Sequence, residues 1–115
     1  MIKRKDPQQI EQMKAAGALS KAALRLAGTM VVPGTSTLAI DQAVESFIRS
    51  NGGKPAFKGY GGFPGSICAS VNEQVVHGIP SEAVVLKEGD ILSVDTGATL
   101  NRWVGDNAWT FYCGE

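Results

Sequence analysis

The sequence predicts an α+β fold in which two N-terminal helices pack on an antiparallel β-sheet. Two observations carry this prediction. Residues 7–48 place apolar side chains at helical spacing, and from residue 54 onward the chain changes to short β-branched runs separated by glycine and proline. No internal repeat or interdomain linker divides the 115 residues, so we expect one domain spanning residues 1–115.

The first helix has a typical start signal in Asp6-Pro7-Gln8-Gln9. Asp6 is expected at the N-cap, Pro7 at the first helical position and Gln9 where a capping box places an amide or acid. Gly28 is a plausible stop, so the helix is predicted over residues 7–27. Its apolar face is expected to contain Ile10, Met13, Gly17 and Leu24.

A second helix is predicted after the break Val31-Val32-Pro33-Gly34. Ser36 or Thr37 supplies its N-cap, and Asn51-Gly52-Gly53 ends it. The side chains expected to point inward are Ile40, Val44, Phe47 and Ile48.

Five apolar runs in the second part of the chain are predicted as strands of the antiparallel sheet. They cover residues 66–71, 74–78, 83–86, 90–99 and 103–113.

Composition excludes several function classes. Eleven basic residues balance eleven acidic ones, so the chain has no electrostatic signature for nucleic acid or for an anionic membrane. No apolar run has the length of a signal-peptide core or a membrane span, and Cys68 and Cys113 form no CxxC motif. These features predict a cytoplasmic protein with two reduced thiols.

Asp95 and Asp106 are the most informative polar residues, because both lie in apolar strands joined by a short turn near residues 101–102. If two or four residues form that turn, both side chains point to the same face as opposite or diagonal neighbours. Two carboxylates that close either share a proton or hold a cation. A metal site is therefore predicted.

The simpler interpretation is that both aspartates are solvated acids near a hairpin turn, and a three-residue loop would remove the parity argument. The apolar neighbours favour the metal site, because a carboxylate buried without a partner is costly. Asp95 follows Ile91, Leu92 and Val94, and Asp106 lies among Trp103, Val104, Trp109 and Phe111.

His77, the single histidine, precedes a Gly-Ile-Pro turn. A lone histidine is commonly structural or exposed, but its place at a turn leaves a catalytic or substrate-contacting role open. Nearby glycines allow close turns in the backbone. Between them stand Phe57, Tyr60, Phe63 and Cys68, a soft apolar set that suits a methionine side chain and is equally compatible with ordinary core.

Three motifs together resemble the N-terminal half of a bacterial type I methionine aminopeptidase: GYGGFPGSICASVNEQVVHGIP, LKEGDILSVDTGA and GDNAWTF. The resemblance covers almost the whole chain, including the VVPGTST connection between the helices. It implies half of the pita-bread fold, residues 1–115 as the N-terminal half of a metalloaminopeptidase catalytic domain, and removal of the initiator methionine from peptides and nascent proteins.

By this resemblance, Asp95 and Asp106 correspond to the first two of five ligands of a dinuclear centre, with Asp106 bridging. His77 corresponds to the catalytic histidine near the scissile peptide. Phe57, Tyr60, Phe63 and Cys68 correspond to the methionine pocket. The two divalent ions would be cobalt, manganese, iron or zinc. Val104 stands where family members often have a histidine.

The family's remaining ligands, one histidine and two glutamates, and its second catalytic histidine fall in its C-terminal half, beyond the residues of this chain. Two carboxylates cannot satisfy two ions that each need four to six donors. We therefore expect a complementing C-terminal half or a homodimer whose C2 interface pairs two half-folds. The alternative function is a non-catalytic module that binds peptides or self-associates.

Overall fold

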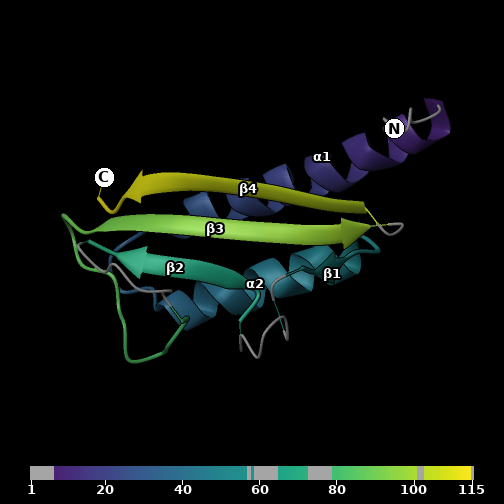
Figure 1. Cartoon of the computed structure of the whole chain (residues 1–115). Helices are drawn as coiled ribbons and strands as arrows, with labels where there is room; N and C mark the ends of the chain where they lie inside the picture. Colours follow the sequence, from purple (N-terminus) through teal and green to yellow (C-terminus); the bar gives the residue numbers. More distant parts are fainter. Residues whose placement is uncertain (1–6, 57, 59–64, 73–78, 101–102, 115) are drawn as a thin grey trace.

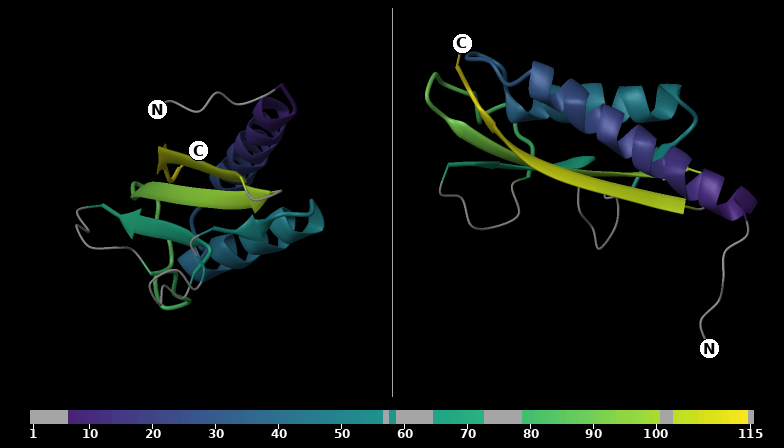
Figure 2. Two further views of the ribbon diagram at one scale, coloured as in Figure 1. Left: turned by 45° about the vertical axis from the view of Figure 1, so that its right-hand side comes forward. Right: turned by 90° about the horizontal axis from the view of Figure 1, so that it is seen from above.

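The computed structural model describes residues 7–56, 58, 65–72, 79–100 and 103–114. Its elements are α1 (Pro7–Thr29), α2 (Thr37–Ser50), β1 (Lys54–Pro55), β2 (Ile67–Val71), β3 (Ile91–Leu100) and β4 (Trp103–Tyr112). Both helices lie on the same face of the sheet, so the molecule has two layers (Figures 1 and 2). The predicted α+β architecture is confirmed.

The sheet is organised around β3, which pairs with every other strand in antiparallel orientation. β4 lies along one edge of β3 over its whole length. Along the other edge, β2 pairs with residues 92–96 and β1 with residues 98 and 99. β3 is thus the central strand, and its neighbours fix the position of every side chain on it.

The core lies between the helices and the even-numbered side chains of β3. Leu92, Val94, Thr96 and Ala98 are all buried. They meet the inward faces of the helices and the odd-numbered residues of β2, and the helical members are Leu19, Ala23, Leu24, Ala27, Ile40, Val44 and Ile48. Because strand side chains alternate, the odd-numbered residues of β3 lie on the opposite face, called the open face below.

α2 follows the sequence prediction closely. Ser36 is the N-cap, with extended backbone angles and a side chain that accepts from the Ala39 N–H, and Asn51 is the C-cap. Ile40, Val44 and Ile48 are buried as predicted, and Phe47 packs against the core while partly exposed.

α1 is two residues longer than predicted, and part of its predicted apolar face is wrong. Ile10 and Met13 are exposed, whereas Ala16, Leu19 and Ala23 are buried further along the helix. The physical reason is length: the start of α1 extends past the end of the sheet (Figure 1), so little of the sheet covers the first turns of the helix. The expected N-cap, Asp6, lies outside the described residues.

The strand predicted over residues 83–86 is also wrong. Val85 forms one isolated bridge with Ser36, and Leu86 exchanges backbone hydrogen bonds with Gly34 and Thr35. This segment wraps the start of α2, so its backbone groups are satisfied by the connection between the helices. The strand predicted over 74–78 lies outside the described residues, and β1 was not predicted.

Candidate metal centre

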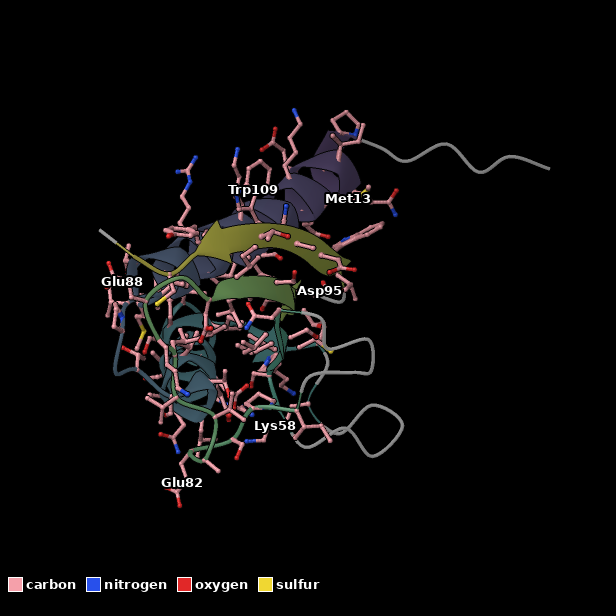
Figure 3. All side chains as sticks on the ribbon, turned by 90° about the vertical axis from the view of Figure 1, so that its left-hand side faces the viewer. Met13, Lys58, Glu82, Glu88, Asp95 and Trp109 are labelled. Carbon is pink, nitrogen blue, oxygen red and sulfur yellow. The ribbon has the colours of Figure 1, made fainter. Side chains whose placement is uncertain are left out.

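The β3–β4 hairpin brings Asp95 and Asp106 together on the open face. Leu100 pairs with Trp103, so two residues separate the strands. The turn therefore has an even number of residues, as the prediction of a shared face required. Asp106 is opposite Gly97, and Asp95 is opposite Ala108. The two aspartates are therefore diagonal neighbours, one of the two arrangements predicted, and Asp95 points to the side of β3 away from α2 (Figure 3).

The two carboxyl groups interact directly. Burial, followed by a hydrogen bond with Asp106 and the negative charge of that residue, raises the pKa of Asp95 to about 6. Two like charges held this close favour a shared proton over two free carboxylates. The prediction that the pair either shares a proton or holds a cation thus has a geometric basis.

One oxygen of the carboxylate pair suits a divalent cation. Asp95 Oδ1 is buried and has no hydrogen-bond partner among the described residues. A buried carboxylate oxygen without a donor is costly, and a hard cation is one of the few groups that satisfies it. Within the described ranges no three histidine, cysteine or acidic side chains are grouped so that they could hold a metal ion. The pair fits part of a cation site and requires further ligands to complete it.

Cys68 lies directly beside the pair. It is the residue of β2 that pairs with Asp95 of β3, and alternation places both side chains on the open face. Burial raises the pKa of the Cys68 thiol, and the nearby Asp95 charge acts in the same direction. The thiol is therefore held neutral, which suits an apolar contact more than a metal ligand.

The other predicted site residues fall outside the described ranges: Phe57, Tyr60, Phe63 and His77. Of the seven candidates, the structure brings together Asp95, Asp106 and Cys68. Val104, which stands where family members often have a histidine, is on the same face as Asp106 and is 64% exposed. No side chain on this face of the described part covers it.

Packing against α1 holds Asp106 in place, and the sequence analysis missed this. Gly105 approaches the backbone of Ala16 so closely that a Cβ there would collide with it. At the start of β4, the indole N–H of Trp103 donates to Gln12 Oε1 at 2.9 Å. The Gly-Asp pair in the sequence signals this arrangement: the glycine admits the helix, and the next residue points to the open face.

Comparison with known proteins agrees with these features. The model of metallopeptidase family M24 matches residues 11–115. Methionine aminopeptidase 1 of Mycobacterium tuberculosis is 53% identical over 106 residues, covering 92% of this chain and 40% of that protein. Methionine aminopeptidase of Clostridium acetobutylicum is 50% identical over 115 residues, covering all of this chain and 46% of that protein.

A solved structure agrees as well. The crystal structure of methionine aminopeptidase from Thermotoga maritima superposes with a TM-score of 0.92 at 46% identity, covering 100% of this chain and 46% of that one. The chain spans less than half the length of these relatives. Its two helices and antiparallel sheet are one half of the pita-bread fold, and the chain belongs to metallopeptidase family M24, on the side of the type I methionine aminopeptidases.

Proposed function

We propose that this chain contributes the first half of the active centre of a methionine aminopeptidase, with Asp95 and Asp106 as ligands of divalent metal. The observation that carries the proposal is the diagonal carboxylate pair, in which Asp95 Oδ1 is buried without a partner. The similarity to methionine aminopeptidases supports the substrate class, an N-terminal methionine of a peptide or nascent protein.

We propose a separate role for each group of residues. Asp95 and Asp106 would hold the ions, and Cys68 would border the site as part of the methionine pocket together with Phe57, Tyr60 and Phe63. His77 contacts the scissile peptide. When bound, the ions supply Lewis-acid chemistry, namely acidification of water and polarisation of a carbonyl. The family assignment implies divalent metal, and we propose manganese, cobalt, iron or zinc.

The remaining ligands are proposed to come from a second half-fold. The relatives are about twice as long as this chain, which supports a complementing C-terminal half; a second copy of the chain is the alternative partner. We propose the cytoplasm as the compartment, where nascent chains are available. The described part contains no helix long and apolar enough to cross a membrane.

The test is methionine release from a Met-Ala-Ser peptide in the presence of Mn²⁺ or Co²⁺, with the C-terminal half of a methionine aminopeptidase added as a separate chain to supply the remaining ligands. The wild-type protein is compared with Asp106→Ala, and with Glu82→Gln, which removes an exposed acid from a loop, as the matched control. We expect release that is lost in Asp106→Ala, by a factor of at least about 100 because a metal ligand is removed, and unchanged in Glu82→Gln. Release that survives in Asp106→Ala would contradict the proposed role.

A further inference from the structure

β4 is the outermost strand of the sheet, and within the described residues it pairs with β3 alone. Its other edge, called the free edge below, faces away from β3 (Figure 1). Cys113, just after β4, donates its N–H to the Asp90 carbonyl at 2.8 Å and accepts from the Gly89 N–H at 2.8 Å. The odd-numbered residues of β4 therefore direct their backbone groups at β3 and its extension.

The even-numbered residues of β4 direct their backbone groups at the free edge, because successive residues of a strand alternate in direction. The opposite edge of β3 agrees with this assignment. There the Ile91 carbonyl accepts from the Asn72 N–H at 2.7 Å, so odd-numbered residues of β3 face β2 and even-numbered ones face β4. The free edge thus presents the N–H and C=O groups of five residues, namely Val104, Asp106, Ala108, Thr110 and Tyr112.

The free edge lacks the features that usually keep strand edges apart. Edge strands of monomeric proteins commonly carry lysine, proline or a bulge that prevents pairing with a second chain. β4 contains no lysine, arginine or proline, its register with β3 is continuous from Trp103 to Tyr112, and Asp106 is its only charged residue. Val104, Trp109 and Tyr112 are exposed apolar side chains on it. The edge therefore suits the addition of another strand.

We propose that the free edge pairs with the same edge of a second copy of this chain, the two β4 strands running antiparallel about a twofold axis at Ala108. Ala108 is the middle one of the five residues, so this register alone gives every backbone group of the free edge a partner. The inference goes beyond the proposed function and does not depend on it, because the pairing uses the backbone of β4 and needs no metal.

The side chains on the open face fit this register. Val104 lies opposite the partner's Tyr112, which by symmetry gives two apolar cross-strand pairs. Asp106 lies opposite the partner's Thr110, whose hydroxyl is 3.2 Å from Ser93 Oγ and can donate to the carboxylate. The two copies of Asp106 are four residues apart along the paired strands, about 14 Å, so their charges do not oppose each other. The edge is therefore complementary to itself.

The α1 side of the pairing brings two indole rings together. Trp109 lies on the α1 side of β4 and is nevertheless 66% exposed, so α1 does not cover this part of the edge (Figure 3). In the proposed register Trp109 is opposite the partner's Asn107, and the two copies of Trp109 are diagonal neighbours within reach of aromatic contact. Pairing thus buries an apolar surface that a single copy leaves in water.

Cysteine cross-linking in EDTA tests the register. Ala108→Cys places two thiols opposite each other across the axis, at a Cα separation of about 5.5 Å, which a disulfide spans. Thr110→Cys is the matched control, because residue 110 is equally exposed on the same face and its two copies lie about 14 Å apart. Under mild oxidation, we expect at least about tenfold more disulfide-linked dimer from Ala108→Cys than from Thr110→Cys or the wild type. Equal cross-linking of the two variants, or none in Ala108→Cys, overturns the proposal.

Sedimentation velocity in EDTA measures the association itself. Ala108→Pro removes an N–H that points to the free edge and takes no hydrogen bond from β3, so the strand tolerates it, whereas Ala108→Val keeps the N–H. We expect dimers of the wild type and of Ala108→Val, and dimerisation at least about tenfold weaker in Ala108→Pro. A strictly monomeric wild type, or equal dimerisation in Ala108→Pro, overturns the proposal. Neither experiment requires methionine release, so failure of the proposed function would leave both results decisive.

Discussion

The chemical properties of Asp95 depend on the residues that neighbour it in the sheet. Its backbone belongs to a regular strand, and its side chain is placed by alternation alone. The chemistry comes from Asp106 across the hairpin and from Cys68 on the other side, both fixed by strand register. A carboxyl group with a pKa of about 6 results, poised between binding a proton and binding a cation.

The raised pKa predicts how stability depends on pH in the metal-free protein. Between about pH 4 and 6 the folded chain keeps a proton on Asp95 that the unfolded chain has lost, so this group's contribution falls as pH rises through that window. Asp106→Asn removes the like charge and should reduce the fall by on the order of 1 kcal/mol, allowing for solvent screening.

Urea unfolding in EDTA at pH 4.5, 5.5, 6.5 and 7.5 measures this difference. Asp41, whose pKa burial raises, acts in the same direction as Asp95, whereas Glu45 and Asp90, whose pKa values are lowered, add stability as pH rises at the acidic end of this range. The informative quantity is therefore the difference in unfolding free energy between the wild type and Asp106→Asn at each pH. A difference that does not change between pH 4.5 and 7.5 would contradict the coupling of the two carboxyl groups.

The sequence predicted that Asp95 and Asp106 share one face of the sheet, but it did not predict that Cys68 lies opposite Asp95. Parity placed Asp95 and Asp106 on one face because both strands are continuous and the turn is short. The register of Cys68 opposite Asp95 depends on how β2 enters the sheet, and that is set by the contact between Asp41 and the start of β2. No local pattern in residues 65–72 contains this information.

At the scale of elements, the site depends on the seating of the β3–β4 hairpin on α1. Gly105 packs against the helix backbone, Ser20 Oγ donates to the Thr96 carbonyl at 3.3 Å, and Phe111 lies against Gly28. Small residues on both partners allow the close approach. The hairpin therefore contacts α1 at two separate points, Gly105 near one end and Phe111 near the other. Because Asp106 directly follows Gly105, the first contact positions this aspartate.

Gly105→Ala is predicted to disturb this seating. Its Cβ would meet the backbone of Ala16 and Gly17, which cannot move aside as a flexible side chain would, so we expect a loss of about 1–3 kcal/mol in unfolding free energy. Gly17→Ala is the matched control, because a Cβ there meets nothing within 4 Å and should stabilise the helix by about 0.5–1 kcal/mol. Denaturant unfolding of both variants measures the contrast.

Equal stability of Gly105→Ala and the wild type would show that β4 and α1 are not packed this closely. An equal loss of unfolding free energy in Gly17→Ala would show that α1 itself is sensitive to the substitution, and not its contact with Gly105.

The elements also show which sequence signals are reliable. Capping residues and helical periodicity located α2 because its whole length faces the sheet. The same signals misplaced the buried face of α1, since Ile10 and Met13 near its start remain exposed and its buried residues begin at Ala16. The 83–86 run has strand composition, yet tertiary hydrogen bonds with residues 34–36 decide its conformation.

At the scale of the whole molecule, the exposed open face of the sheet is the surface on which we expect a partner to bind. Helices cover the other face, and in the described part nothing covers this one (Figure 2). Ile91 and Tyr112 form a cross-strand pair there and are 47% and 66% exposed, and Val104 is exposed on the same face. Exposed Ile91, Val104 and Tyr112 among the polar side chains of this face form a surface on which a partner is expected to pack.

This predicts concentration-dependent association of the 115-residue chain. Tyr112→Lys places a charge on the open face and should weaken association at least about tenfold, whereas Ile10→Lys, on the overhanging part of α1, should leave it unchanged. Sedimentation velocity across a range of protein concentrations measures this. A strictly monomeric, well-folded chain would contradict pairing of two copies and would leave the complementing half as the partner.

The most direct test of the metal centre is Mn²⁺ binding at pH 7.5 by titration calorimetry. We predict that the wild type binds Mn²⁺, that affinity falls at least about tenfold in Asp95→Asn and in Asp106→Asn, and that it is unchanged in Glu82→Gln, because only the first two variants replace a carboxylate oxygen of the pair. Equal affinity in all four proteins would contradict the assignment of Asp95 and Asp106 as metal ligands.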